Sequence, residues 1–204
     1  MVMLVNASSL IGCPILSLHV GGQIARVTEL VIDPDKLSLI AVRVEGPVVD
    51  PNDGGDILAM DSVREFSRAG MIVDSSDEFV RDEDVMRIKK VLQLNFDLNG
   101  LKVVTKKKEK LGKVEDFILQ STTWEVQQLI VRRPIMKSLI DPELMIHRSQ
   151  ILKVDDYKVT VKDEREKVKS KPRSSSTKDL VPDFVNPFRK PDFAPEGQSS
   201  SSSE

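Results

Sequence analysis

Short runs of alternating apolar and polar residues, separated by turn residues, fill the first part of the chain. In the run from Ser38 to Glu45, Ile40, Val42 and Val44 fall on one side of an extended backbone. The runs 14–20 and 24–32 flank Gly21 and Gly22, a pair that can supply the positive φ angles of a tight hairpin turn. With shorter runs at 57–60 and 71–73, the pattern predicts a small closed or nearly closed β-barrel.

The pattern then recurs. The segment from Ile24 to Ile32 is echoed about 87 positions later, from Leu111 to Leu119. Further strands are predicted at 102–105, 126–131, 144–146 and 159–161. The offset of about 87 places His147 opposite Met60, and after that point the offset between the copies becomes about 88. The turn at 106–110 has no glycine, so we expect a longer or looser hairpin there. Such a repeat predicts two related structural units.

Between the copies, the segment from Asp82 to Leu94 changes to helical spacing, with Asp82 as a candidate N-cap. We expect a short helix whose apolar side packs between the two barrels. From about Arg165 onward, Lys, Pro and Ser dominate, which predicts a disordered tail. The expected architecture is therefore all-β, with barrels at 8–80 and 96–163, a helical linker at 81–95 and a tail at 164–204.

The repeated segments resemble the PRC-barrel family. The first copy has Leu10-Ile11-Gly12, then Gly22-Gln23-Ile24-Ala25-Arg26-Val27; the second has Leu111-Gly112-Lys113-Val114-Glu115-Asp116-Phe117. Together the matches cover most of residues 8–162, although Ala25 stands where the family usually has glycine. The resemblance implies two PRC-type barrels. It also implies a docking role rather than catalysis, since familiar members use this barrel to bind proteins.

Composition narrows the function classes. The 204 residues carry a net charge of −2, so the electrostatic footprint of a nucleic-acid-binding protein is missing, and RNA contact through the ribosome is the weaker alternative. No apolar run approaches the roughly 20 residues needed to span a bilayer, and the first ten residues lack the pattern of a secretion signal. We expect a cytoplasmic protein without membrane insertion, in which Cys13 is a buried, inert thiol.

Catalytic and metal-binding patterns are weak. His19 and His147 have no triad partners in any motif, and neither a nucleophile elbow nor a Walker loop is present. The loop from Asp50 to Asp61 partly mimics an EF-hand, but it lacks the fifth ligand and the terminal glutamate, which favours a solvated hairpin loop. The sequence therefore predicts no enzyme, no cofactor and no metal.

Two groups of residues are candidates for partner binding. Basic side chains gather in the second copy, and aromatic ones stand in the Pro-rich tail: Lys106, Lys107, Lys108, Arg132 and Arg133; Phe184, Phe188 and Phe193. The basic groups are either one shared patch or solvated turns. The phenylalanines either dock on a partner or pack onto the chain's own barrels.

The resulting hypothesis is a non-enzymatic, protein-binding adaptor of two PRC barrels with a peptide-like tail. The alternatives are a ribosome- or RNA-associated factor and a small-ligand or metal-binding protein. The sequence identifies neither the partner nor the biological process.

Overall fold

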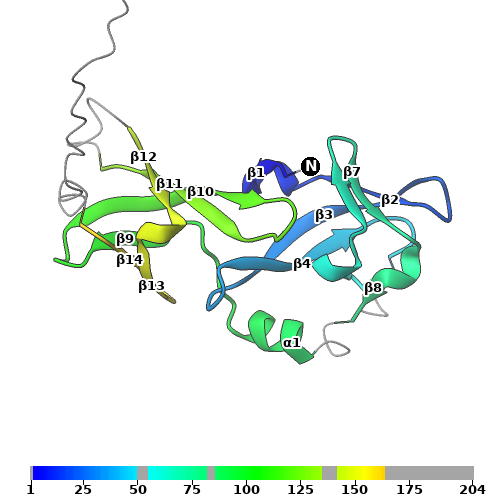
Figure 1. Cartoon of the computed structure of the whole chain (residues 1–204). Coiled ribbons are helices and arrows are strands. Elements are labelled where there is room, and N and C mark those ends of the chain that lie inside the picture. Colours follow the sequence, from blue (N-terminus) through cyan, green and yellow to red (C-terminus); the bar gives the residue numbers. More distant parts are fainter. Residues whose placement is uncertain (1, 50–54, 82–85, 135–141, 164–204) are drawn as a thin grey trace, which may run out of the picture. The chain divides into compact units, whose positions relative to one another are not determined.

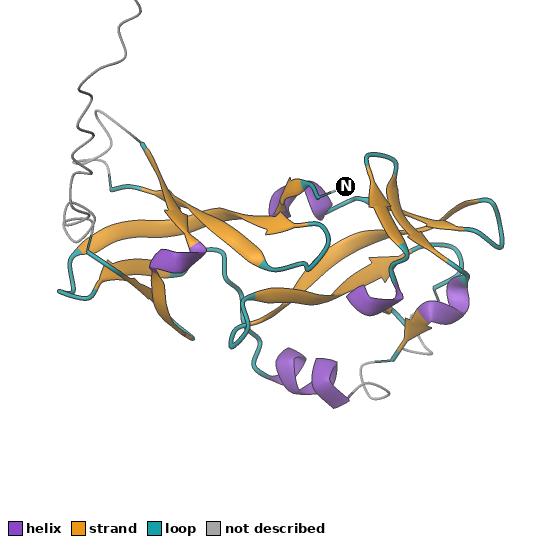
Figure 2. Cartoon of the chain, in the orientation of Figure 1, coloured by secondary structure: helices purple, strands orange, loops and turns teal. Residues whose placement is uncertain are grey.

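In its described residues the protein is mostly β, with two seven-stranded sheets and one short α-helix (Figures 1 and 2). The computed structural model describes residues 2–49, 55–81, 86–134 and 142–163. Each sheet is built on one copy of the repeat, called below the first copy (8–80) and the second copy (96–163). Neither pairing path returns to its starting strand within the described residues, so each sheet is open in its hydrogen bonding there.

The first sheet has the order β6-β7-β2-β3-β4-β5-β8. Its long central hairpin joins β3 to β4, and β2 pairs with β7 in parallel. The strands are β2 (Pro14–Ser17), β3 (Gly22–Asp33), β4 (Ser38–Glu45), β5 (Ile57–Ala59), β6 (Glu65–Ser67), β7 (Gly70–Val73) and β8 (Phe79–Val80).

The second sheet has the matching order β13-β14-β9-β10-β11-β12, in which β13 corresponds to β6 and β12 to β5. β1 pairs in addition with β10. Its central hairpin joins β10 to β11, and β9 pairs with β14 in parallel. The strands are β1 (Leu4–Asn6), β9 (Lys102–Thr105), β10 (Lys110–Gln120), β11 (Val126–Arg132), β12 (Glu143–His147), β13 (Ile151–Asp155) and β14 (Lys158–Val161). The copies therefore share one topology.

Two details of the predicted strand pattern are wrong. The register of β3 with β4 shifts between Val31 and Ile32, leaving Ile40 as an extra residue on β4. This bulge turns Ile40 away from Val42 and Val44, toward the opposite face of the sheet. In addition, β2 ends at Ser17, and Leu18 and Val20 are exposed in the following turn.

The turn of the second copy is no longer than that of the first. Four residues separate β2 from β3, and four separate β9 from β10. Lys108 adopts φ 66°, where Gly21, 87 positions earlier, adopts 68°. The lysine thus takes a left-handed conformation that costs a residue with a Cβ about 1–2 kcal/mol, and the hairpin keeps its length without a glycine.

The segment in front of each copy packs on the other copy. β1 precedes the first copy but pairs with β10 of the second, where Asn6 lies opposite Ile118. The helix α1 (Met86–Gln93) precedes the second copy but packs on the first sheet (Figure 1). Its buried Ile88 and Val91 cover Val31, Ala41 and Ile57. The expectation that the helix packs between two barrels is wrong, because its apolar side is buried against one sheet; Asp82 lies outside the described residues.

The tips of the two central hairpins meet through equivalent residues. Ser38 forms an antiparallel bridge with Glu125, its counterpart 87 positions later. The Leu39 N–H donates to the Trp124 carbonyl oxygen and the Val126 N–H donates to the Leu37 carbonyl oxygen, both at 2.9 Å. The copies therefore pair across a local two-fold relation, as the subunits of a homodimer would.

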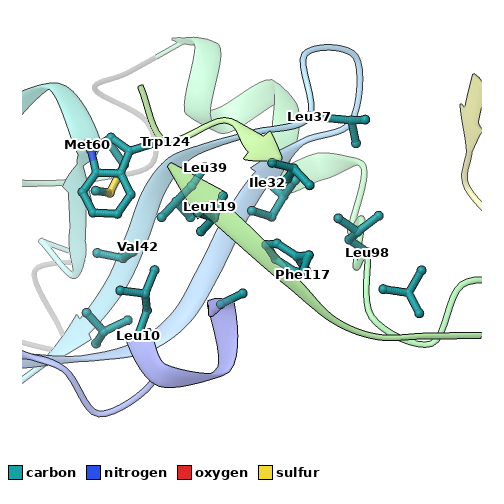
Figure 3. Close-up of a cluster of buried hydrophobic side chains, with 14 of the residues drawn as sticks. Leu10, Ile32, Leu37, Leu39, Val42, Met60, Leu98, Phe117, Leu119 and Trp124 are labelled. Atoms are coloured by element: carbon teal, nitrogen blue, oxygen red, sulfur yellow. The ribbon is translucent and has the colours of Figure 1, made fainter. Parts of the chain in front are cut away.

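One hydrophobic core includes both copies. Leu10, Ile32 and Leu39 of the first copy are buried in the same cluster as Phe117 and Leu119 of the second (Figure 3). Trp124 also packs edge-on against Phe66, with ring centroids 5.4 Å apart. The two repeat units are thus fused through a common interior.

Candidate protein-docking surfaces

The outer face of the second sheet carries exposed apolar side chains. On β12, Met145 is 56% exposed and lies opposite the half-buried Ile130. Ile118 lies diagonal to Ile130 across β10 and β11, and Leu4 on β1 is 62% exposed. We call the surface formed by Leu4, Ile118, Ile130 and Met145 the open face. Scattered apolar residues are normal on protein surfaces, but a connected set on one sheet face indicates a contact site.

The corresponding face of the first copy is covered. Ile57, the counterpart of Met145, is 0% exposed, because α1 packs over it and β8 pairs beside it. Val31, the counterpart of Ile118, is also buried under the helix. Within the described residues, the second copy has no counterpart of α1 or of β8 that covers the open face. The same fold element is therefore sealed in one copy and accessible in the other.

The register of β12 corrects the sequence alignment. Gln128 lies opposite His147 in the second copy, just as Ala41 lies opposite Ala59 in the first. His147 is thus the counterpart of Ala59 rather than Met60, because the offset has reached 88 before β12 begins. His147 caps the short helix η4 (Arg148–Gln150), where its ring nitrogen accepts from the Ser149 N–H at 3.2 Å. That contact explains His147 without catalysis.

A row of basic side chains crosses the second sheet. Lys158, Lys102, Lys113 and Arg132 occupy directly opposed positions on β14, β9, β10 and β11, and all four are exposed. We call these four residues the basic row. Like charges directly opposite one another destabilise a sheet. The first copy has Gly70, Pro14, Arg26 and Glu45 at these places, so the row is specific to the second copy.

The predicted basic residues lie at the same end of β10 as this row. Lys106, Lys107 and Lys108 form the turn before β10, and Arg132 ends the neighbouring strand β11. Two of the charges are engaged: Lys107 lies 3.6 Å from Asp163, and Arg132 forms a two-pronged contact with Glu115. Arg133 extends the ladder through its N–H, which donates to the Pro142 carbonyl oxygen. Sequence spacing alone could not align Lys102, Lys113 and Lys158, because strand pairing brings them together.

Charge also distinguishes the copies. Residues 8–80 contain 5 Lys and Arg against 12 Asp and Glu, whereas residues 96–163 contain 13 against 10. The near-neutral total of −2 therefore hides an acidic first copy and a basic second copy. An anionic partner would be steered toward the second copy.

Other candidate sites gain little from the structure. Phe184, Phe188 and Phe193 lie outside the described residues, as do residues 50–54 of the EF-hand-like loop. No cluster of three metal-ligating side chains occurs within the described ranges. In that part of the chain, no helix is both long and apolar enough to cross a membrane.

Two surface grooves have volumes of about 260 and 810 Å³. The larger passes Phe66, Trp124 and Arg68, and neither groove is lined by His147 or Asp116. Asp116 instead accepts from the Ser8 N–H at 3.1 Å and from the Ser8 Oγ at 2.6 Å. These bonds fasten the N-terminal segment to β10, so the carboxylate has a structural role.

Cys13 is partly buried against the core. Burial raises the pKa of its thiol, and a hydrogen bond with the Met71 backbone only partly opposes this effect. A thiol with a raised pKa remains protonated near neutral pH, and the thiol is a poor nucleophile compared with the thiolate. The chemistry of Cys13 thus agrees with packing rather than catalysis.

No protein-family model matches this chain, and no curated protein matches it significantly.

Proposed function

We propose that this chain is a non-enzymatic, protein-binding adaptor built from two PRC-type barrels, and that its second copy makes the contact. The observation that carries this proposal is the difference between equivalent faces: Ile57 is sealed under α1, whereas Met145 is exposed on the open face. The first copy serves as the folded support, because its corresponding surface is already used within the chain. The basic row beside the open face adds electrostatic selectivity.

The test is affinity capture with the full chain from lysate of its source organism, using matched variants. Met145→Lys places a charge on the open face and is expected to reduce recovery of specifically bound protein about ten-fold or more, as expected when a buried apolar contact is replaced by a desolvated charge. Leu18→Lys is the control, because Leu18 is similarly exposed but lies in a turn of the first copy. Equal recovery with both variants would contradict docking through the open face.

The second candidate function is association with ribosomal RNA, and the basic row favours it. Lys102, Lys113 and Lys158 have no ion-pair partner among the described residues, so they are available for phosphate groups. Co-sedimentation with ribosomal particles would then weaken steeply with salt. The slope of the logarithm of the binding constant against the logarithm of the salt concentration measures this dependence. The double variant Lys102→Gln with Lys113→Gln should reduce its magnitude by about 1.4–1.8, since each phosphate contact contributes about 0.7–0.9. An unchanged slope would remove this alternative.

A further inference from the structure

The edge strand β12 differs from the other sheet edges in length and protection. β8 has only two residues, β1 has three, and β6 has three between the exposed Arg64 and Arg68. β13 is interrupted by a register shift and carries a Lys153–Asp155 ion pair. β12 has five residues in regular register with β11 and an apolar side chain at its centre. Natural sheets normally protect such edges with charge, proline, bulges or short length.

The backbone direction of β12 follows from its pairing. The Arg133 N–H donates to the Pro142 carbonyl oxygen, which makes that pair hydrogen-bonded. In an antiparallel ladder such pairs alternate, so Leu144 and Ile146 direct their backbone groups toward β11. Glu143 and Met145 consequently direct theirs away from the sheet. His147 also points outward, and its N–H donates to the Gln150 side chain at 3.0 Å. Glu143 and Met145 therefore provide the outward hydrogen-bonding positions of β12 that have no partner among the described residues.

The first copy shows what such an edge accepts. There, β5 pairs with β8 in antiparallel fashion, with Ile57 opposite Val80 and Leu58 opposite Phe79. Met145 and Ile146 are the counterparts of Ile57 and Leu58, since β4–β5 and β11–β12 have the same register at an offset of 88. An occupant of β12 would accordingly place an aliphatic residue opposite Met145 and an aromatic residue opposite Ile146.

Charge specifies one further position. Glu143 is exposed and has no ion-pair partner within the described part of the chain. Arg132, which lies opposite Glu143 on β11, is already bound to Glu115. In the register of β8, the residue opposite Glu143 lies two places after the aliphatic one. A basic residue there would complement the exposed carboxylate.

We propose that β12 binds an extended segment of a partner protein, which adds to the second sheet as an antiparallel strand. The segment has an aromatic residue, an aliphatic residue, any residue and then a basic residue. Backbone hydrogen bonds to Glu143 and Met145 hold it, and the side chains set the register. The inference rests on the proposed adaptor function and names the chemistry of its partner.

The test uses the full chain and a synthetic peptide with the sequence of residues 76–82, in which Asp82→Lys supplies the basic residue opposite Glu143. Binding is measured by the chemical shifts of β12 amides and by fluorescence anisotropy of the labelled peptide. Met145→Pro removes the outward N–H while leaving the bonds to β11 in place, since that N–H is not part of the ladder. We expect the affinity to fall about ten-fold or more, because a hydrogen bond is lost and the proline ring obstructs the approaching strand.

Two controls separate strand addition from general stickiness. Met145→Leu keeps both the N–H and the apolar side chain, so its affinity should stay within about two-fold of the original. The unmodified 76–82 peptide, with Asp82 facing Glu143, should bind a few-fold more weakly, as expected for one exposed charge pair. If Met145→Pro unfolds the chain, Met145→Lys provides the same test, because a lysine at the centre of an edge strand also disfavours pairing.

Several outcomes would overturn the inference: no binding, binding unaffected by both Met145→Pro and Met145→Lys, or a concentration-dependent dimer of the chain that these variants abolish. The last would assign the edge to a second copy of this protein. None of these outcomes bears on lysate capture through the open face, so the adaptor function is refuted separately, by equal recovery with Met145→Lys and Leu18→Lys.

Discussion

Individual residues in this protein hold conformations that the repeat imposes on them. Leu37 and Trp124 both have positive φ, 50° and 56°, although neither is glycine. They occupy equivalent places at the hairpin tips, and both are buried. Burial and the paired backbone bonds offset a conformation that would otherwise cost about 1–2 kcal/mol for each residue. Lys108 has the same backbone strain but is exposed, so nothing comparable offsets its cost.

We therefore predict that Lys108→Gly raises the free energy of unfolding by about 0.5–1 kcal/mol, because glycine adopts positive φ without a steric penalty. Lys107→Gly is the matched control: its φ is not positive, so it should leave stability unchanged or lower it by up to about 1 kcal/mol. Urea unfolding of both variants gives the comparison. A loss of stability in Lys108→Gly would show that the turn is not strained.

At the scale of elements, α1 is an amphipathic cover for one sheet rather than an independent helix. It has eight residues, shorter than isolated helices that are stable in water. Its stability comes from Ile88 and Val91, which are buried against β3, β4 and β5. The helix is consequently part of the first sheet's core, although it precedes the second copy in sequence.

Ile88→Ala should lower the free energy of unfolding by about 2–5 kcal/mol, the range for removing a buried isoleucine side chain beyond Cβ. Met86→Ala on the same helix should change it by no more than about 0.5 kcal/mol, because Met86 is exposed. Chemical denaturation of both variants measures the difference. Equal effects would mean that the helix does not cover the sheet.

The elements also show what the sequence could predict. The ranges of β4 and β9 were predicted to the residue. Plain alternation bounded by turn residues marked β4, and correspondence with the first copy marked β9. β1, β6, β8 and β13 were missed: the first three have only two or three residues each, too few for a period to show. The bulge at Ile40 could not be predicted, because it is defined by the register of β4 with β3 and not by the alternation within β4. The basic residues at 106–108 and 132–133 were visible as runs, but the basic row needed the register of four strands.

At the scale of the whole molecule, the copies share an interior and exchange their leading segments. The repeat predicted two units, and it could not reveal that Leu39 and Phe117 belong to one cluster. The two copies also contact each other through equivalent residues 87 positions apart, as in the bridge between Ser38 and Glu125. Neither copy has a complete core of its own, so we expect the two to unfold together.

The chain contains one tryptophan, at the joint between the copies, and one cysteine, in the first copy. We predict that Trp124 fluorescence and protection of Cys13 against alkylation are lost at the same urea concentration. Phe117→Ala should lower both midpoints together, with a loss of about 3–5 kcal/mol. Two separated midpoints would contradict a shared core.

The two copies cover their equivalent sheet edges differently, and this difference affects stoichiometry. A symmetric homodimer of identical barrels would display two equal edges and could bridge two ligands or grow into a chain of subunits. Here the covalent link allows one half to mask its edge with β8 while the other keeps β12 exposed. Among the described strands, each polypeptide then offers one such acceptor edge, so complexes formed through it are expected to be one-to-one and to terminate rather than polymerise.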